Sequence, residues 1–257
     1  MEFLQVETNE YITTITLNRP PANALSQAIF KELSDVFIDM REDERTRVIV
    51  LQGEGRFFCA GADIKEFTTL QHADDYEVLA KNGQRVFEYM ENYPKPIIAS
   101  IHGAALGGGL ELAMSCHIRL VSENAKLGLP ELQLGLIPGF AGTQRLPRYV
   151  GTGKAAEMML TSEPITGKEA VKLTLANHAY SEEDLKEETL KLAKKIAKKS
   201  PVSIKAALEL LQYTKSSNFH EGVEKEAHLF GKVFDSNDAK EGVSAFIEKR
   251  EPSFSGR

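Results

Sequence analysis

The chain has little cysteine and no excess of positive charge. Its 257 residues include two cysteines, Cys59 and Cys116, which form neither a CxxC pair nor a disulfide framework. Such sparse cysteine is typical of a protein in a reducing compartment. The formal net charge is −6 at pH 7, so the chain as a whole gives no electrostatic reason to expect nucleic acid as a partner.

Segments for export and membrane insertion are also lacking. Residues 1–4 do not begin the basic segment and apolar core that a signal peptide requires. The most apolar stretch, residues 96–113, is interrupted by Ser100, His102 and Glu111, so we expect a core strand and helix there instead of a membrane span. The sequence therefore predicts a cytoplasmic protein that does not engage a membrane.

Several common catalytic motifs are missing. No GxGxxG follows the early strands, which disfavours a Rossmann dinucleotide site. There is no HExxH, no cluster of histidine and cysteine and no GxSxG, so neither a metal centre nor a serine nucleophile is predicted. Gly151-Thr152-Gly153-Lys154 is similar to the end of a P-loop, but Ala155 follows the lysine and the leading glycine is absent.

Two further features have ordinary interpretations. The lysine-rich run at 191–199 has the apolar spacing of a helix, so its lysines are expected on a solvated face, with RNA binding as the lesser alternative. His102 stands at the end of a predicted strand beside Gly103, where we expect a hydrogen-bonded core histidine. Neither feature by itself predicts a function.

Hydrophobic patterns predict an α/β core followed by helices. Residues 6–17 have the alternation of a hairpin, and 47–52, 96–102 and 118–121 resemble buried strands. Strand, glycine-rich turn and helix recur between residues 47 and 121, which is typical of an α/β domain. The predicted helices run from Ser26 as N-cap to about Met40, over 75–93, from near Gly107, and over 142–149, 152–160, 167–173, 182–199, 201–215, 218–234 and 237–249.

Two glutamates lie in apolar, glycine-rich segments. Glu111 follows Gly107-Gly108-Gly109, and Glu131 precedes the segment 135–139, which begins and ends with glycine. Burial of an ionised carboxylate is costly, so such a side chain is paired, neutralised or used in chemistry. Two of them beside flexible backbone predict a site that moves protons, with internal capping or salt bridging as the alternative.

The glycine-rich turns allow two interpretations. Three successive glycines at a helix start cost conformational entropy, so either the backbone approaches a ligand with free N–H groups or the helix packs tightly on a strand. The loop at 60–65 raises the same choice. Its small residues let an N–H reach a bound carbonyl and Lys65 meet a phosphate, whereas the ordinary interpretation makes Asp63 a helix N-cap.

The order of these motifs resembles the crotonase, or enoyl-CoA hydratase/isomerase, superfamily over essentially the full length. The resemblance implies an α/β fold made of a crotonase-like spiral of β-β-α repeats. It implies a core with the catalytic site over residues 1–195 and a helical C-terminal trimerisation region over 196–257, assembled as a homotrimer or a dimer of trimers. The matching segments are 17–20 with 23–25, 58–64, 95–99, 103–113, 130–131, 135–139, 142–146, and 241–246 with 248–250.

The resemblance also implies an acyl-CoA substrate and a site. The backbone N–H groups of Ala62 and Gly108 would form an oxyanion hole for the thioester, and Glu111 and Glu131 would hold one water. No metal and no cofactor is implied, because the coenzyme A thioester is itself the substrate. Further substrate contacts are implied for Ala60, Gly61, Asp63, Ile64 and Lys65 at the coenzyme A end, Gly139 beside the water, and Phe246 and Lys249 from the same or a neighbouring subunit.

The pair of glutamates discriminates among the reactions of this family. Glutamate at both positions is the hydratase pattern, whereas isomerases usually keep one. We therefore expect addition of water across the 2,3 double bond of a trans-2-enoyl-CoA in fatty-acid metabolism, giving a 3-hydroxyacyl-CoA. Glu111 would activate the water and Glu131 would protonate C2. The alternatives are a hydratase for a branched substrate such as methylglutaconyl-CoA, an enoyl-CoA isomerase and, more distantly, a non-catalytic acyl-CoA or RNA-binding protein.

Overall fold

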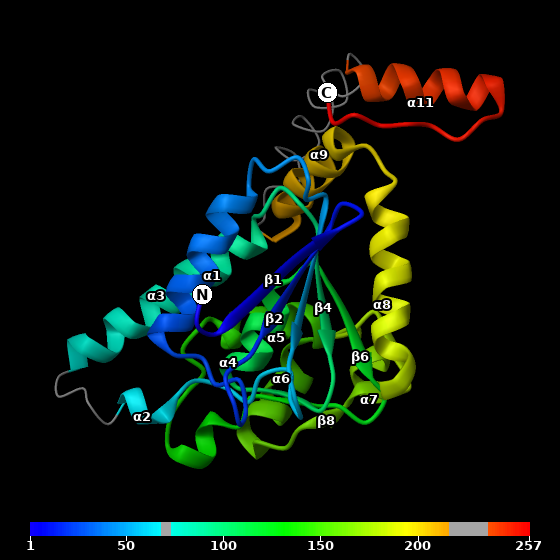
Figure 1. Cartoon of the computed structure of the whole chain (residues 1–257). Coiled ribbons are helices and arrows are strands. Elements are labelled where there is room, and N and C mark those ends of the chain that lie inside the picture. Colours follow the sequence, from blue (N-terminus) through cyan, green and yellow to red (C-terminus); the bar gives the residue numbers. More distant parts are fainter. Residues whose placement is uncertain (68–72, 216–235) are drawn as a thin grey trace.

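The main sheet has six strands in the order β1-β2-β3-β4-β6-β9 (Figure 1). The structure is a computed structural model that describes residues 1–67, 73–215 and 236–257. β1 and β2 form an antiparallel hairpin, and each later pair of neighbours is parallel. The strands are β1 (Leu4–Asn9), β2 (Ile12–Leu17), β3 (Val48–Gly53), β4 (Ile97–Ile101), β6 (Ile118–Ser122) and β9 (His178–Tyr180).

A smaller sheet of three short strands, in the order β5-β7-β8, carries the start of the site. β5 (Ala104–Leu106) is parallel to β7 (Lys126–Gly128), and β7 is antiparallel to β8 (Ile165–Thr166). The chain leaves β5 through Gly107 and enters helix α4 (Gly108–Ser115). The pairing of β5 with β7 therefore fixes where this helix begins.

Helices flank both sheets, and serine side chains cap several of them. They are α1 (Gln27–Met40), α2 (Ile64–Phe67), α3 (Ala73–Glu91), α5 (Gly142–Val150), α6 (Thr152–Thr161), α7 (Gly167–Lys172), α8 (Glu182–Ala197), α9 (Pro201–Gln212) and α11 (Asn237–Glu248), with the 3-10 turns η1 (Glu131–Leu134) and η2 (Tyr213–Lys215). The Ile29 N–H donates to Ser26 Oγ at 3.3 Å, which confirms the predicted cap of α1. Across the described ranges, no helix has the length and apolar character needed to cross a membrane.

The main sheet separates two apolar cores, because successive side chains of its central strands point to opposite faces. Ile49 and Leu51 of β3 belong to the larger core, whereas Val48 and Val50 belong to the smaller one. Helices α1 and α3 lie on the side of the larger core, and α8 covers the opposite face with residues such as Leu185 (Figure 1). The site lies on the side of the larger core.

Most predicted elements are present, with ends shifted by a few residues. The hairpin, the three buried strands and the helices from Ser26, over 75–93 and from near Gly107 are confirmed. The expectation of an almost wholly helical chain after residue 142 is wrong at β8 and β9. These short strands pair with β7 and β6, so distant partners determine their conformation more than local periodicity does. The helix predicted at 218–234 lies outside the described residues.

Helix α11 projects from one end of the molecule, remote from α2 (Figure 1). Its first turn is tied to the end of the chain by the buried side chain of Asp238. The Ser255 N–H donates to Asp238 Oδ1 at 2.7 Å, and the Ser200 hydroxyl, which caps α9, donates to Oδ2 at 2.8 Å. The last residues are therefore held against the start of α9.

Candidate active site

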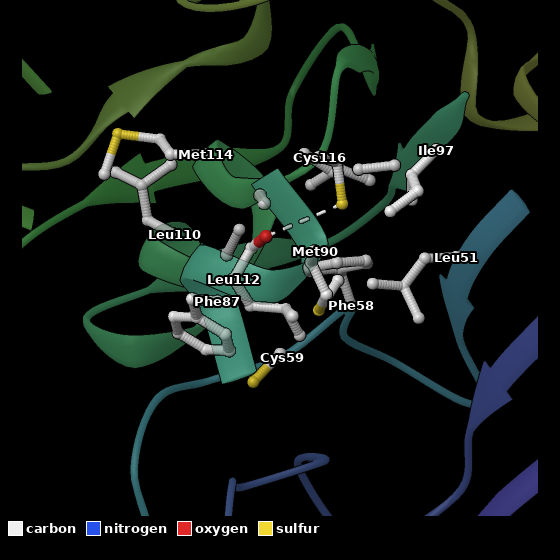
Figure 2. Packing of buried hydrophobic residues seen from close by; sticks show 14 of the residues in the cluster. Leu51, Phe58, Cys59, Phe87, Met90, Ile97, Leu110, Leu112, Met114 and Cys116 are labelled. Atoms are coloured by element: carbon white, nitrogen blue, oxygen red, sulfur yellow. Dashed lines mark hydrogen bonds between the residues drawn. The ribbon is translucent and has the colours of Figure 1, made fainter. Parts of the chain in front are cut away.

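Helix α4 positions Glu111 and is buried along its whole length. Leu110, Leu112 and Met114 extend from it into the larger core, where Phe87 and Met90 of α3 meet them (Figure 2). Packing on this scale fixes the helix axis and leaves little freedom to rotate the residues that it carries. Glu111 is thus a polar side chain on a rigid apolar helix.

The glycine run before Glu111 lets α4 pack tightly on neighbouring backbone and lets the Glu131 carboxylate approach the turn closely. A Cβ on Gly109 would lie 2.1 Å from the Cys59 carbonyl oxygen, so this position packs helix against backbone. Gly107 has φ +52°, which favours glycine, and its Cβ would lie 2.9 Å from Glu131 Oε1. The Glu111 N–H donates to the Gly107 carbonyl at 3.0 Å. The Glu131 carboxylate therefore packs against the turn from which the helix carrying Glu111 begins.

The carboxylate of Glu111 is held by the N-terminus of α5. Its side chain is 1% exposed, and Oε1 accepts the N–H of Phe140 at 2.8 Å and the N–H of Gly142 at 2.7 Å. Gly142 is the first residue of α5, where the helix dipole favours a negative charge. Between described residues no hydrogen bond engages Oε2 of Glu111, so one oxygen is fixed by the protein and the other is available.

The carboxylate of Glu131 lies at the start of η1 and is half-buried. Its Oε1 lies against Gly107, and its Oε2 is buried with no hydrogen-bond partner among the described residues. A buried carboxyl oxygen without a partner costs free energy unless a water, a substrate or a proton satisfies it. Oε2 of Glu131 can therefore bond to a polar group of a bound molecule or carry a proton.

Burial raises the pKa of Glu111 to about 7, and the neighbouring Glu131 carboxylate acts in the same direction. The N–H groups of Gly142 and Phe140 and the guanidinium of Arg145 oppose this rise. Burial also raises the pKa of Glu131. Glu111 therefore gains and loses a proton close to neutral pH, and Glu131 does so above its usual range, as a site that both removes and delivers protons requires.

Two backbone donors lie side by side near these acids. The Ala62 nitrogen lies 3.3 Å from the place that a Cβ on Gly108 would occupy. Gly61 and Asp63, on either side of Ala62, bond to Leu25 through the Gly61 carbonyl and the Asp63 N–H. In the part of the chain that the structure describes, neither the Ala62 N–H nor the Gly108 N–H donates to another group. Two free N–H groups on adjacent segments of backbone can together hold an oxygen that gains negative charge.

The loop at 60–65 contains the residues expected to contact the coenzyme A end of the substrate. Ala60 and Gly61 lead into the donor at Ala62, and Asp63 caps the next turn by accepting the Lys65 N–H at 3.0 Å and pairing with Arg19. The ordinary interpretation of Asp63 is thus confirmed. Ile64 is 45% exposed, and the Lys65 side chain is also exposed.

The remaining expected substrate contacts are Gly139 and the C-terminal residues Phe246 and Lys249. No atom lies within 4 Å of a Cβ placed on Gly139, so there is open space beside this residue. Lys249 is exposed and directly follows α11, a helix that lies far from α2 in the same chain (Figure 1). The side chain of Phe246 lies outside the described residues. Within one chain the structure therefore does not bring Lys249 to the loop at 60–65.

Arg145 is a site residue that the sequence interpretation missed. It is 4% exposed, donates from Nη1 to the Phe140 carbonyl at 2.7 Å, and pairs through Nε with Glu91 Oε2 at 3.0 Å. From α3, Gln84 Nε2 donates to the Gly139 carbonyl at 2.8 Å. An arginine on an amphipathic helix gives no sequence signal of burial, so these contacts depend on the folded arrangement of α3, α4 and α5.

The lysine run behaves as expected, whereas His102 makes the expected hydrogen bond but lies outside the core. Lys191 pairs with Glu187 and Glu188, and Lys194 pairs with Glu10, so part of the lysine face is already neutralised. His102 Nε2 lies 2.9 Å from the Gly55 carbonyl oxygen, in a half-buried position. Over residues 1–67, 73–215 and 236–257, no three His, Cys, Asp or Glu side chains gather as metal ligands.

Comparison with known proteins gives consistent matches over the whole chain. The family model described as Enoyl-CoA hydratase/isomerase matches residues 7–257. A probable enoyl-CoA hydratase of Bacillus subtilis is 53% identical over 257 residues, which is 100% of each chain. A crotonyl-CoA hydratase of Syntrophomonas wolfei is 37% identical over 255 residues, with 98% of each chain covered. The crystal structure of an enoyl-CoA hydratase from Bacillus anthracis superposes with a TM-score of 0.95 at 36% identity, covering 99% of this chain and 100% of that one.

Proposed function

The chain belongs to the enoyl-CoA hydratase/isomerase family, and from that premise we propose that Glu111 and Glu131 carry its chemistry. Its activity is that of an enoyl-CoA hydratase, a lyase that adds water across the 2,3 double bond of a trans-2-enoyl-CoA to give a 3-hydroxyacyl-CoA. The expected family and the crotonase-like α/β fold are thereby confirmed. The residue roles below are our proposal.

The proposed mechanism begins with the thioester oxygen. It accepts the N–H groups of Ala62 and Gly108, which draws electron density away from C3 and makes that carbon electrophilic. The same two donors stabilise the negative charge that develops on the oxygen during addition. The loss of one such donor in an enzyme typically lowers turnover about 10²- to 10³-fold.

The observation that carries the assignment is the unequal environment of the two carboxylates. Two backbone N–H groups hold Oε1 of Glu111, which limits the rise of its pKa caused by burial and leaves Oε2 to act as a base. Glu131 has a buried oxygen with no partner among the described residues, which favours a protonated acid that can donate. In the proposed step, Glu111 takes a proton from water as the water oxygen bonds to C3. The double-bond electrons move to the thioester oxygen, and Glu131 then protonates C2 as the enolate collapses.

The proposed reaction moves protons and one water and oxidises nothing. Carboxylates and backbone donors suffice for it, so we propose that the enzyme needs no cofactor beyond the coenzyme A of its substrate. The pair shares its protons, and the apparent pKa values in a pH–rate profile therefore belong to both glutamates together. Treatment with EDTA is expected to leave turnover unchanged, and a loss restored by a divalent metal would contradict this part.

The proposal is tested by Glu111→Gln and Glu131→Gln in a steady-state assay with crotonyl-CoA. Hydration removes the conjugated enoyl thioester, so loss of its absorbance gives the rate. Each variant is expected to lose about 10²- to 10⁴-fold in turnover while still binding coenzyme A in calorimetry. Glu123→Gln is the matched control, because Glu123 pairs with Lys168 and has no part in the proposed mechanism. Near wild-type hydration by both site variants would overturn the proposal.

For the acyl group we propose a short straight chain, supported by the similarity to a crotonyl-CoA hydratase. A carboxylated or branched substrate such as methylglutaconyl-CoA would be favoured by a free cation at the acyl end. Arg145, the cation beside Glu111, is already bonded to Glu91 and the Phe140 carbonyl. Comparison of turnover on crotonyl-CoA and 3-methylglutaconyl-CoA tests the choice, and a higher rate on the branched thioester would reverse it.

We also propose a homotrimer or a dimer of trimers in the cytoplasm. Helix α11 projects from the rest of the molecule (Figure 1), and its Val243 is 49% exposed, which supports assembly. Assembly would also let Lys249 of one subunit approach the coenzyme A of another. The buried free thiols of Cys59 and Cys116 fit a reducing compartment. Native mass spectrometry distinguishes trimer from hexamer, and a monomeric mass would contradict the assembly.

A further inference from the structure

A buried ion pair lies directly behind the turn that holds Glu111. Arg145, on the first turns of α5, donates to the Phe140 carbonyl at 2.7 Å and to Glu91 Oε2 at 3.0 Å. The Phe140 N–H, on the other side of the same residue, donates to Glu111 Oε1 at 2.8 Å. One residue of the turn therefore joins the guanidinium to the carboxylate.

The ion pair is anchored on α3 and satisfied on several sides. The side chains of Arg145 and Glu91 are 5% and 14% exposed, and Arg148 approaches Glu91 Oε1 at 3.2 Å. A buried arginine in a bidentate or networked geometry has its charge and its direction fixed. α3 thus transmits its position to the turn at 140–142 through one guanidinium.

We propose that Arg145, held by Glu91, is a positioning residue that keeps the Phe140 and Gly142 N–H groups directed at Glu111 and sets the pH range in which Glu111 accepts a proton. This inference deepens the proposed function, since it rests on Glu111 acting as the base. Arg145 acts through the backbone turn and its charge, without contact with the substrate.

The charges around Glu111 determine whether each variant makes its ionisation harder or easier. Glu131 faces it from η1 and Arg145 from α5, with Glu91 of α3 and Arg148 of α5 behind the arginine. The thiols of Cys59 and Cys116, which pack near α4, remain protonated because burial raises the pKa of each to about 12. Removal of the Arg145 charge leaves Glu91 less compensated and makes ionisation of Glu111 harder. Removal of the Glu91 charge leaves the arginine charge less compensated and makes ionisation of Glu111 easier.

The test is the pH dependence of kcat/KM for crotonyl-CoA in Arg145→Gln, Arg145→Lys and Glu91→Gln. For Arg145→Gln we expect kcat/KM to fall about tenfold, as the loss of one orienting hydrogen bond implies, with the acid limb moved up by about one pH unit. For Glu91→Gln we expect the acid limb to move down. Arg145→Lys keeps the positive charge, so its acid limb should stay near that of the wild type. Its ammonium donates from one nitrogen and cannot reproduce both guanidinium contacts, so kcat/KM should lie between the values for Arg145→Gln and the wild type.

Arg45→Gln is the matched control, because the exposed Arg45 pairs with Asp43 and touches neither Glu91 nor the Phe140 carbonyl. Its kcat/KM is expected to stay near the wild-type value. Thermal melting and circular dichroism establish that each variant is folded. If Arg145→Gln does not fold, Arg145→Lys and Glu91→Gln carry the test alone, and an unmoved acid limb in Glu91→Gln overturns the inference.

The results separate this inference from the proposed function. Acid limbs that move in opposite directions for Arg145→Gln and Glu91→Gln support it, whereas a purely structural role would lower activity in both without opposite displacements. A wild-type profile in folded Arg145→Gln, or displacement of both limbs in one direction, overturns it. If Glu111→Gln remains fully active, the proposed function itself fails. If Glu111→Gln is inactive while Arg145→Gln is unaffected, only the positioning role fails.

Discussion

Gly142→Ala gives a sharp test of how the backbone controls Glu111. Gly142 does not have the positive φ that favours glycine, so its backbone conformation is open to alanine. The new Cβ, however, would lie 2.8 Å from Glu111 Oε1 and 3.0 Å from both Glu111 Cγ and Leu129 Cδ1. Two of these three contacts, including the shortest, are with Glu111, so its carboxylate must move away from the Gly142 N–H even if Leu129 also shifts.

The size of the effect follows from the contact that is lost. A hydrogen bond to a charged group is worth about 1.5–3 kcal/mol, which corresponds to about a 10- to 100-fold fall in kcat/KM if the contact positions the base. We expect kcat to carry the loss and KM for crotonyl-CoA to change little, because the Ala62 and Gly108 donors are untouched. The assay is steady-state hydration followed by the absorbance of the enoyl thioester.

Gly153→Ala is the matched control for this variant. Gly153 lies in α6, has no positive φ, and a Cβ there meets nothing within 4 Å. Its activity should equal that of the wild type, and its stability should rise by about 0.5–1 kcal/mol, as expected for glycine to alanine in a helix. Folded Gly142→Ala with unchanged kcat/KM would refute the reasoning that the N–H of Gly142 orients Glu111.

Two further predictions concern stability. Gly109→Ala places a Cβ 2.1 Å from the Cys59 carbonyl oxygen, so the overpacking should cost about 1–3 kcal/mol in urea unfolding, and an unchanged midpoint would show that α4 can move away from this segment. The pKa of Glu111 is raised from an ordinary 4.5 to about 7, so the native state keeps a proton that the unfolded chain has lost between these values. The contribution of Glu111 to the free energy of unfolding should therefore be fully present below pH 4.5 and fall as pH rises to 7. Glu111→Gln should flatten this part of the curve, and parallel curves for the two proteins would contradict the raised pKa.

Much of the site can be predicted from the sequence because its residues violate local rules. A glutamate after three glycines in an apolar segment is costly unless it is used, and this made Glu111 and Glu131 visible without coordinates. The approach of the Glu131 carboxylate to Gly107, four residues before Glu111, is not visible in the sequence, since it depends on β5 pairing with β7 and on η1 following that strand. Ser26 was predictable because an N-cap acts within a single helical turn.

The supporting residues were hidden for a different reason. Arg145 has the sequence environment of an exposed helical arginine, and its burial depends on Glu91, more than fifty residues earlier in the chain. The N–H groups of Phe140 and Gly142 are present in every backbone, so only the turn geometry gives them a role. The strands β8 and β9 are similarly short, at two and three residues, and carry no periodicity that distinguishes them from loops.

The central claim is that Glu111 and Glu131 act as one unit on one water. Its most direct test is kcat for hydration of crotonyl-CoA by Glu111→Gln, Glu131→Gln and the double variant, measured on folded protein with coenzyme A binding intact. If the two acids act together, the double variant should be scarcely slower than the slower single variant, because either loss already disables the pair. Losses that multiply in the double variant, or a single variant near the wild-type rate, would contradict the claim.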